Sequence, residues 1–260
     1  MNFINEIYNR NKLLAHCGTA FLVLTLILGI YAPFNDVEVL GINSMIKPIK
    51  FSLSIWIYAW SFAYILEYFE DKKAVRRFSV LATIVMIFEQ AVINIQAFRG
   101  KLSHFNQTEI LGGILYALMG IMIAWLTVST LLITLKFIRQ KSFSISSDKV
   151  LSIQLGLIIF IIFSFWGGYM SAVNTHTVGA ELGAKGMPFL NWSNVFGDLR
   201  IAHFFGVHAL QVVPIFGFFM SSFKTSESKK RTYVWIFALI YFAFVSFTMI
   251  QALMGRAFVS

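Results

Sequence analysis

The chain has 260 residues, of which 58% are hydrophobic, 13% are charged and 28 are Phe. A soluble domain of this length could not bury so many apolar side chains in one core, so the composition excludes a soluble globular protein and predicts an integral membrane protein. Membrane topology and anionic lipid headgroups explain the formal net charge of +9, and we predict no nucleic-acid partner.

Seven apolar stretches are long enough to cross a hydrocarbon core about 30 Å thick, which takes about 20 helical residues. In chain order they cover residues 13–34, 50–69, 78–98, 110–137, 150–173, 201–223 and 232–254. The apolar runs are continuous and do not alternate with polar residues, which excludes a β-barrel. We therefore predict an all-α bundle of seven transmembrane helices that forms a single transmembrane domain over residues 1–260.

Basic residues gather on one side of the predicted membrane. The N-terminus and the second, fourth and sixth loops hold 14 of the 21 Lys and Arg residues, namely Arg10, Lys12, Lys72, Lys73, Arg76, Arg77, Lys136, Arg139, Lys141, Lys149, Lys224, Lys229, Lys230 and Arg231. The other side holds Lys47, Lys50, Arg99, Lys101, Lys185, Arg200 and Arg256. Because cytoplasmic loops carry the excess of basic residues, the N-terminus is predicted to be cytoplasmic and the C-terminus outside.

Two pairs of similar peptides recur along the chain. IQAFRG (95–100) closes the third stretch, and IQALMGR (250–256) closes the seventh, 155 residues later. KPIKF (47–51) opens the second stretch, and RIAHF (200–204) opens the sixth, 153 residues later. The near-equal offsets predict a 3+1+3 parallel repeat, a plan used by transporters and other membrane receptors. Its two units would cover residues 13–100 and 150–256, with residues 110–137 as the linker helix.

Four of the five histidines lie on the outer side in this topology, and they are His104, His176, His203 and His208. Neutral imidazoles ligate haem iron and other transition metals. We predict that His203 or His208 is one ligand and that His104 or His176 is the second. His203 and His208 are five residues apart, so they do not easily share one small ion, and the four-residue spacing of zinc metalloproteases is absent. The alternative is that each histidine hydrogen-bonds a neighbouring helix.

Glu89 is the one carboxylate expected deep in the bilayer, within the third stretch. A charged carboxylate is expensive in hydrocarbon, so it must be paired or protonated. It shares a helical face with Gln96, seven residues later, and its expected partner is His208 or Arg200. Three roles stay open for Glu89, which are a proton relay, a metal ligand and a structural lock. It is our candidate catalytic residue.

Cationic residues at the outer helix ends predict an anion site. Such a group would attract a carboxylate, a phosphate or haem propionates, although long basic side chains also extend to lipid headgroups. Asp198 is placed to cap the helix that follows it. The predicted ligand-binding set is Lys50, Arg99, Arg200, Gln96, Gln211 and Gln251.

Three segments resemble those of a bacterial family of seven-span membrane proteins of unknown activity: KPIKF (47–51), RGKLSHFN (99–106) and GDLRIAHFFGVHALQ (197–211). This resemblance implies the seven-span fold and the bacterial inner membrane as the location, and no activity. The layout from His176 through a Gly-rich loop and Trp192 into a helix with early histidines also resembles haem A synthase. That resemblance implies haem held between histidines on the outer side. The chain departs from that family in having seven spans, not eight, and no cysteine in the loop.

Three functions follow as alternatives. The favoured one is binding of haem or a transition metal for redox chemistry, as a membrane oxidoreductase. The second is a proton-coupled transporter of a small anionic solute, with Glu89 and His208 as proton relays. The third is a membrane ligand sensor. The expected partners are membrane lipids and a small anionic ligand.

Overall fold

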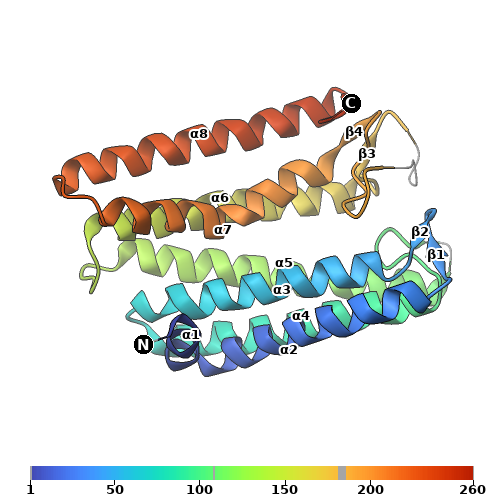
Figure 1. The fold of residues 1–260 in the computed structure, drawn as a ribbon, viewed down its shortest axis with the longest axis horizontal. Helices are drawn as coiled ribbons and strands as arrows, with labels where there is room; N and C mark the ends of the chain where they lie inside the picture. The colour runs from blue at the N-terminus through green and yellow to red at the C-terminus, as the bar shows by residue number, and fades with distance from the viewer. Residues whose placement is uncertain (1, 108, 181–185, 260) are drawn as a thin grey trace. The chain divides into compact units, whose positions relative to one another are not determined.

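The computed structural model describes residues 2–107, 109–180 and 186–259, and all elements named below belong to these residues (Figure 1). The predicted outer cation Lys185 lies outside them. The helices are α1 (Phe3–Arg10), α2 (Lys12–Tyr31), α3 (Ile46–Ile65), α4 (Lys72–Phe98), α5 (Ile110–Arg139), α6 (Ser147–Ala172), α7 (Leu199–Ser221) and α8 (Glu227–Leu253). Seven of these, α2 to α8, are long and apolar enough to cross a membrane. The all-helical, seven-span prediction is thereby confirmed, and the chain has the build of a multi-pass membrane protein.

Several helices begin before the apolar stretches that predicted them. The stretches 78–98 and 232–254 correspond to α4 and α8, which start at Lys72 and Glu227. Each start has a capping side chain: Asp71 accepts a hydrogen bond from the backbone N–H of Ala74, and Ser226 accepts one from Lys229. Such caps satisfy N–H groups that a first helical turn leaves open. Hydropathy located only the apolar part of each helix, because the first turns are polar.

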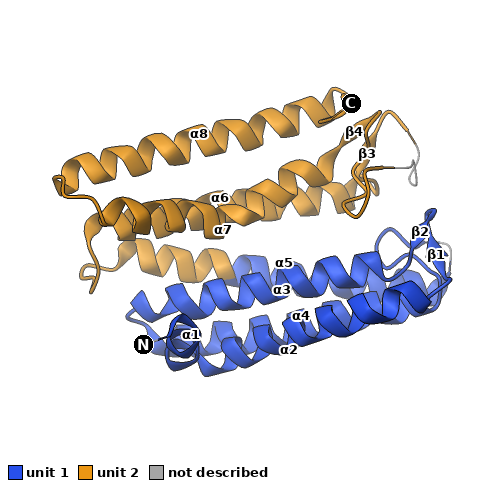
Figure 2. Cartoon of the chain, in the orientation of Figure 1, with its two compact units in different colours: residues 1–129 blue, residues 130–260 orange. Residues whose placement is uncertain are grey.

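The chain divides into two compact units, residues 1–129 and residues 130–260, with the boundary inside α5 (Figure 2). In unit 1, α2 packs along α3, and Thr25 donates a hydrogen bond of 2.8 Å to the Ser52 hydroxyl between them. In unit 2, α6 packs along α7 so closely that a Cβ on Gly206 would overlap Phe163. α8 packs on both α6 and α7. Each unit therefore has its own helix-packing core.

Each unit carries a short antiparallel pair of strands between its first two long helices. In unit 1, β1 (Glu38–Val39) pairs with β2 (Ile42–Asn43). The two loop residues between them have positive φ angles of 54° and 71°, as a two-residue hairpin of type I′ requires. In unit 2, β3 (Thr177–Val178) pairs with β4 (Gly197–Asp198). The strands hold the loops that lead into α3 and α7, and the loop before α7 contains His176 and Asp198.

Two pairs of helices, α3 with α7 and α4 with α8, have equal lengths, whereas the spans of α2 and α6 have 23 and 26 residues. With the 3-10 turn η2 (Leu66–Tyr68), α3 forms a span of 23 residues, and α7 also has 23. Both α4 and α8 have 27. The starts of α3 and α7 differ by 153 residues, and those of α4 and α8 by 155. These are the same two offsets that separate the recurring peptides in the sequence.

Candidate functional site

The polar residues of unit 1 gather where the start of α3 meets the loop after α4. The ammonium of Lys47, in the first turn of α3, lies 3.1 Å from Nδ1 of His104 in that loop. An ammonium can only donate, so Nδ1 accepts and the other ring nitrogen carries the proton. The His104 ring packs against Phe51 and Tyr116, with centroids 5.7 and 5.9 Å away. A cation and an imidazole are thus held together in one place.

Glu89 is buried in α4, with 5% of its surface exposed. Its Oε1 atom is buried and has no hydrogen-bond partner among the described residues. Lys47 is the cation that acts on it electrostatically. Buried polar atoms without partners are rare in folded proteins and need an explanation such as a proton, a ligand or a water. Glu89 was identified from the sequence as a candidate site residue, and its buried Oε1 atom can accept a proton or a hydrogen bond from a ligand or a water.

Gln90, the next residue, is a buried neighbour that the sequence analysis did not select. Its amide nitrogen donates to the backbone oxygen of Pro48 at 3.1 Å and to Oδ1 of Asn94 at 2.7 Å. Its Oε1 atom is also buried without a partner among the described residues. The first hydrogen bond ties α4 to the start of α3, close in sequence to Lys47. In the sequence, the feature that could have identified Gln90 as a site residue is its position beside Glu89 in an apolar stretch.

Arg99 is held by neutralising contacts inside unit 1. Its guanidinium donates to Oε1 of Gln96 at 2.6 Å and to Oε2 of Glu109 at 3.1 Å. Glu109 balances its charge, and the three side chains link the end of α4 to the start of α5. The predicted role of Arg99 in anion binding remains a prediction.

Gln96 and Gln251 make the same contact at the ends of α4 and α8. Each side-chain amide donates to the carbonyl oxygen six residues later, from Gln96 to Leu102 at 3.3 Å and from Gln251 to Ala257 at 2.6 Å. Both helices end in a glycine of positive φ, which closes the last turn. The contacts give both glutamines a structural role, and their predicted ligand-binding role is a separate hypothesis.

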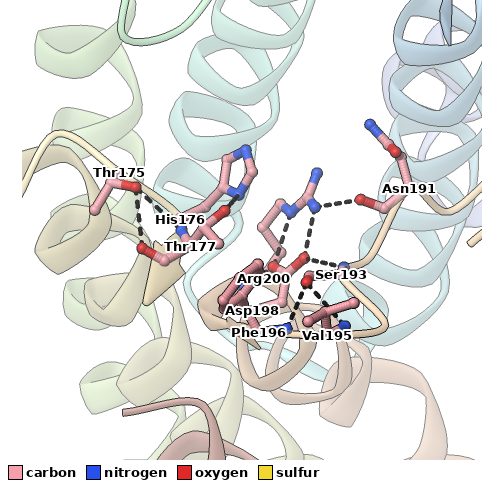
Figure 3. Close-up of polar contacts among 9 residues, drawn as sticks. All are labelled: Thr175, His176, Thr177, Asn191, Ser193, Val195, Phe196, Asp198 and Arg200. Carbon is pink, nitrogen blue, oxygen red and sulfur yellow. Dashed lines mark hydrogen bonds and ion pairs between the residues drawn. The ribbon is translucent and has the colours of Figure 1, made fainter. Parts of the chain in front are cut away.

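In unit 2, the loop before α7 is built around Asp198, which is fully buried (Figure 3). Its carboxylate accepts four hydrogen bonds: from the backbone N–H and Nε of Arg200 at 3.1 and 2.9 Å, from Nη2 of Arg200 at 2.5 Å, and from the Ser193 N–H at 3.0 Å. The bond to the Arg200 N–H confirms that Asp198 caps α7. The same guanidinium also donates to the carbonyl oxygen of Asn191.

Burial by itself would raise the pKa of the Asp198 carboxyl, but the hydrogen bonds and the charge of Arg200 outweigh it. The Ser193 N–H and the nearby His176 act in the same direction, and the pKa lies below its ordinary value. Asp198 is thus an anion at neutral pH, and it is the partner of Arg200. The sequence predicts only a capping role for Asp198, because nothing in the spacing indicates that Asn191 and Ser193 lie beside it.

The three histidines of unit 2 each have a hydrogen-bond partner at Nδ1. His203 lies 2.7 Å from the Phe163 carbonyl oxygen, and His208 lies 3.1 Å from Oε1 of Gln211. His176 lies 3.1 Å from the Thr177 hydroxyl. A carbonyl oxygen only accepts, so Nδ1 of His203 donates and Nε2 carries the lone pair. Lys50 and Gln211 are half-buried, in α3 and α7 respectively.

The described residues contain no group of three or more His, Cys, Asp and Glu side chains that could hold a metal ion. Haem needs fewer protein ligands than such a group supplies. Metal or haem binding by the predicted histidine ligands therefore remains a hypothesis, and the arrangement of the described side chains adds no support for it.

Comparison with known proteins gives no match: no family model fits the chain, and no curated protein and no solved structure is significantly similar to it. Function is therefore inferred from the residues described above.

Proposed function

We propose that the chain is a proton-coupled transporter of a small anionic solute, located in the cell membrane of a bacterium. The observation that carries this proposal is Glu89, a carboxyl buried within an apolar helix with one oxygen atom that has no donor in the described part of the chain. Ionisable residues at such positions in transport proteins carry protons or ions. A proton bound to this carboxyl neutralises it in one state of the transport cycle. Release of the proton restores the negative charge in the other state.

Lys47 and His104 supply the complementary half of the site. An ammonium beside an imidazole offers donors to the oxygen atoms of a carboxylate or a phosphate. Lys47 also acts electrostatically on Glu89. An anion bound at Lys47 would cancel the positive field that favours the ionised carboxylate, so the anion and the proton would bind together. Such a coupling is reciprocal between the two ligands, which is what symport requires.

The proposal includes a parallel repeat of two three-helix units joined by α5, with the N-terminus in the cytoplasm. Two observations support the repeat. The helices α3 and α7 have equal lengths, as do α4 and α8. The glutamines near the ends of α4 and α8 make matching contacts. The excess of basic residues at one set of loops supports the orientation. Internal repeats of this kind are frequent in secondary transporters.

Reconstitution into liposomes tests the transport proposal. With an inward proton gradient, we expect uptake of at least one member of a panel of small carboxylates and phosphate, together with acidification reported by a dye inside. Lys47→Gln should reduce uptake, and Lys101→Gln, an exposed outer cation, serves as the matched control. Uptake that persists after a protonophore collapses the gradient would contradict proton coupling, and no uptake across the panel would contradict a small-anion transporter.

Haem binding is the second candidate, and His203 favours it. Its Nδ1–H faces the Phe163 carbonyl oxygen at 2.7 Å, the kind of contact that orients a metal-binding imidazole and leaves Nε2 for the metal. Iron would supply redox chemistry. However, Arg200, which we expected to hold a propionate, is paired with Asp198, so the set fits haem only in part.

An absorption spectrum of protein expressed with a haem precursor decides this second candidate. The haem proposal expects a Soret band that His203→Ala abolishes or shifts. The control is His16→Ala, which changes an exposed histidine of α2. A colourless protein without stoichiometric metal would count against it.

A further inference from the structure

A stripe of residues on α4, at the end far from Glu89, changes from cationic to apolar along the helix. Spacings of three and four residues place its members on one helical face. We call it the α4 stripe, and it consists of Lys73, Arg76, Arg77, Val80, Leu81 and Ile84. Together with Trp125 of α5, the α4 stripe lines a cavity of about 520 Å³ within unit 1.

The three cations of the α4 stripe make no hydrogen bond and no ion pair with any described residue of the chain, although they line a cavity. The adjacent Lys72 differs, because its ammonium lies 3.3 Å from a carboxylate oxygen of Glu67. Three neighbouring positive charges at a helix start, with no ion pair to any described carboxylate, point to an anion from outside the chain.

The apolar side chains that line the other end of the cavity are exposed. Val80 is 42% exposed, Ile84 is 54% exposed and Trp125 is 61% exposed. Ile84 lies eleven positions after Lys73, so the whole α4 stripe extends about 16 Å along the helix axis at about 1.5 Å per residue, and its apolar part from Val80 to Ile84 extends about 6 Å. The cavity therefore has one cationic end and a shorter apolar wall that can hold part of a lipid acyl chain.

We propose that this cavity binds an anionic phospholipid, with the headgroup phosphate at Lys73, Arg76 and Arg77 and an acyl chain along the apolar end to Trp125. A soluble anion would leave the apolar wall uncovered, and a zwitterionic lipid brings no net negative charge to the cations. Basic pockets between helices on the cytoplasmic side of membrane proteins bind anionic headgroups in this way.

A second cavity, in unit 2, lacks this combination. It measures about 350 Å³ and is lined by Phe216, Met220, Tyr233, Ile236, Phe237 and Ile240, without a cation. Nearby, at the start of α8, the ammonium of Lys230 donates to the Ser221 carbonyl oxygen at 2.9 Å. The cationic cavity in unit 1 is therefore not a general consequence of basic residues at a helix start.

Quenching of Trp125 fluorescence by brominated lipids tests the proposal in purified full-length protein. The signal of Trp125 is the difference between the unmodified protein and Trp125→Phe. We expect brominated phosphatidylglycerol to quench this signal at a roughly tenfold lower mole fraction than brominated phosphatidylcholine, because each basic residue near a membrane surface adds to the attraction for anionic lipid. In the triple variant Lys73→Gln/Arg76→Gln/Arg77→Gln, both brominated lipids should quench Trp125 at the same mole fraction.

The matched control is Lys229→Gln/Lys230→Gln/Arg231→Gln, which removes the same charge from the start of α8 and should keep the preference at Trp125. Equal quenching of the unmodified protein by both lipids would overturn the proposal. A preference that survives the triple variant would overturn it as well. Binding of glycerol 3-phosphate by the unmodified protein, without preferential quenching by brominated phosphatidylglycerol, would show that the cations take a soluble anion and not a lipid.

Discussion

Replacing Glu89 by Gln should abolish proton-coupled uptake while the protein stays folded. Gln has the size of Glu but cannot bind and release a proton, so the loss of uptake should be roughly 100-fold or more, the scale of effect that a positioned proton-transfer group supplies. Because Oε1 of Glu89 has no hydrogen-bond partner among the described residues, removing the carboxyl breaks no such bond. Uptake in liposomes and thermal unfolding in detergent measure the two parts of this result.

Glu67→Gln is the matched control, because it removes a half-exposed carboxylate that forms a surface ion pair with Lys72. It should leave both uptake and melting unchanged, as expected for a surface ion pair. If Glu89 were instead a structural lock, Glu89→Gln would strand a buried charge and lower stability by about 3–5 kcal/mol. Unchanged melting together with unchanged uptake would exclude both roles.

The sequence predicted the seven spans because each needs only a long apolar run, which composition reveals directly. It missed α1, since eight residues with polar members give no such run. The position of α1 depends on distant partners: the Arg10 guanidinium lies 3.9 Å above the Tyr64 ring and 4.8 Å above the Tyr68 ring. It also donates to the Tyr64 carbonyl oxygen at 2.9 Å. Contacts across more than 50 residues leave no periodic signal in a single sequence.

The candidate site was predictable to the same limited degree. A lone carboxylate in an apolar stretch identified Glu89, because the cost of burying charge makes it conspicuous. The sequence could not pair Lys47 with His104, which lie 57 residues apart and meet only when α3 and the loop after α4 fold together. Nor could it show that Arg200, expected at an anion site, is balanced by Asp198 two residues earlier.

Replacing Asp198 by Asn should destabilise unit 2 by about 3–5 kcal/mol, the cost of removing one partner from a buried ion pair. The carboxylate is fully buried and accepts four hydrogen bonds, and an amide keeps one acceptor while turning donors toward Arg200 and Ser193. Chemical unfolding in detergent micelles, followed by circular dichroism, measures the loss. Asp36→Asn changes an exposed carboxylate in the loop between α2 and α3 and should have little effect.

Acid should remove the difference between Asp198→Asn and the unmodified protein. The folded-state pKa of Asp198 lies below its ordinary value of about 4, so its stabilisation is fully present above about pH 4 and is lost as the pH falls through the folded-state pKa. We expect the stability difference to be constant between about pH 5 and pH 8 and to shrink below about pH 4. A difference that instead grew on acidification would mean that the carboxyl is protonated in the folded protein, and that Arg200 finds its counter-charge elsewhere.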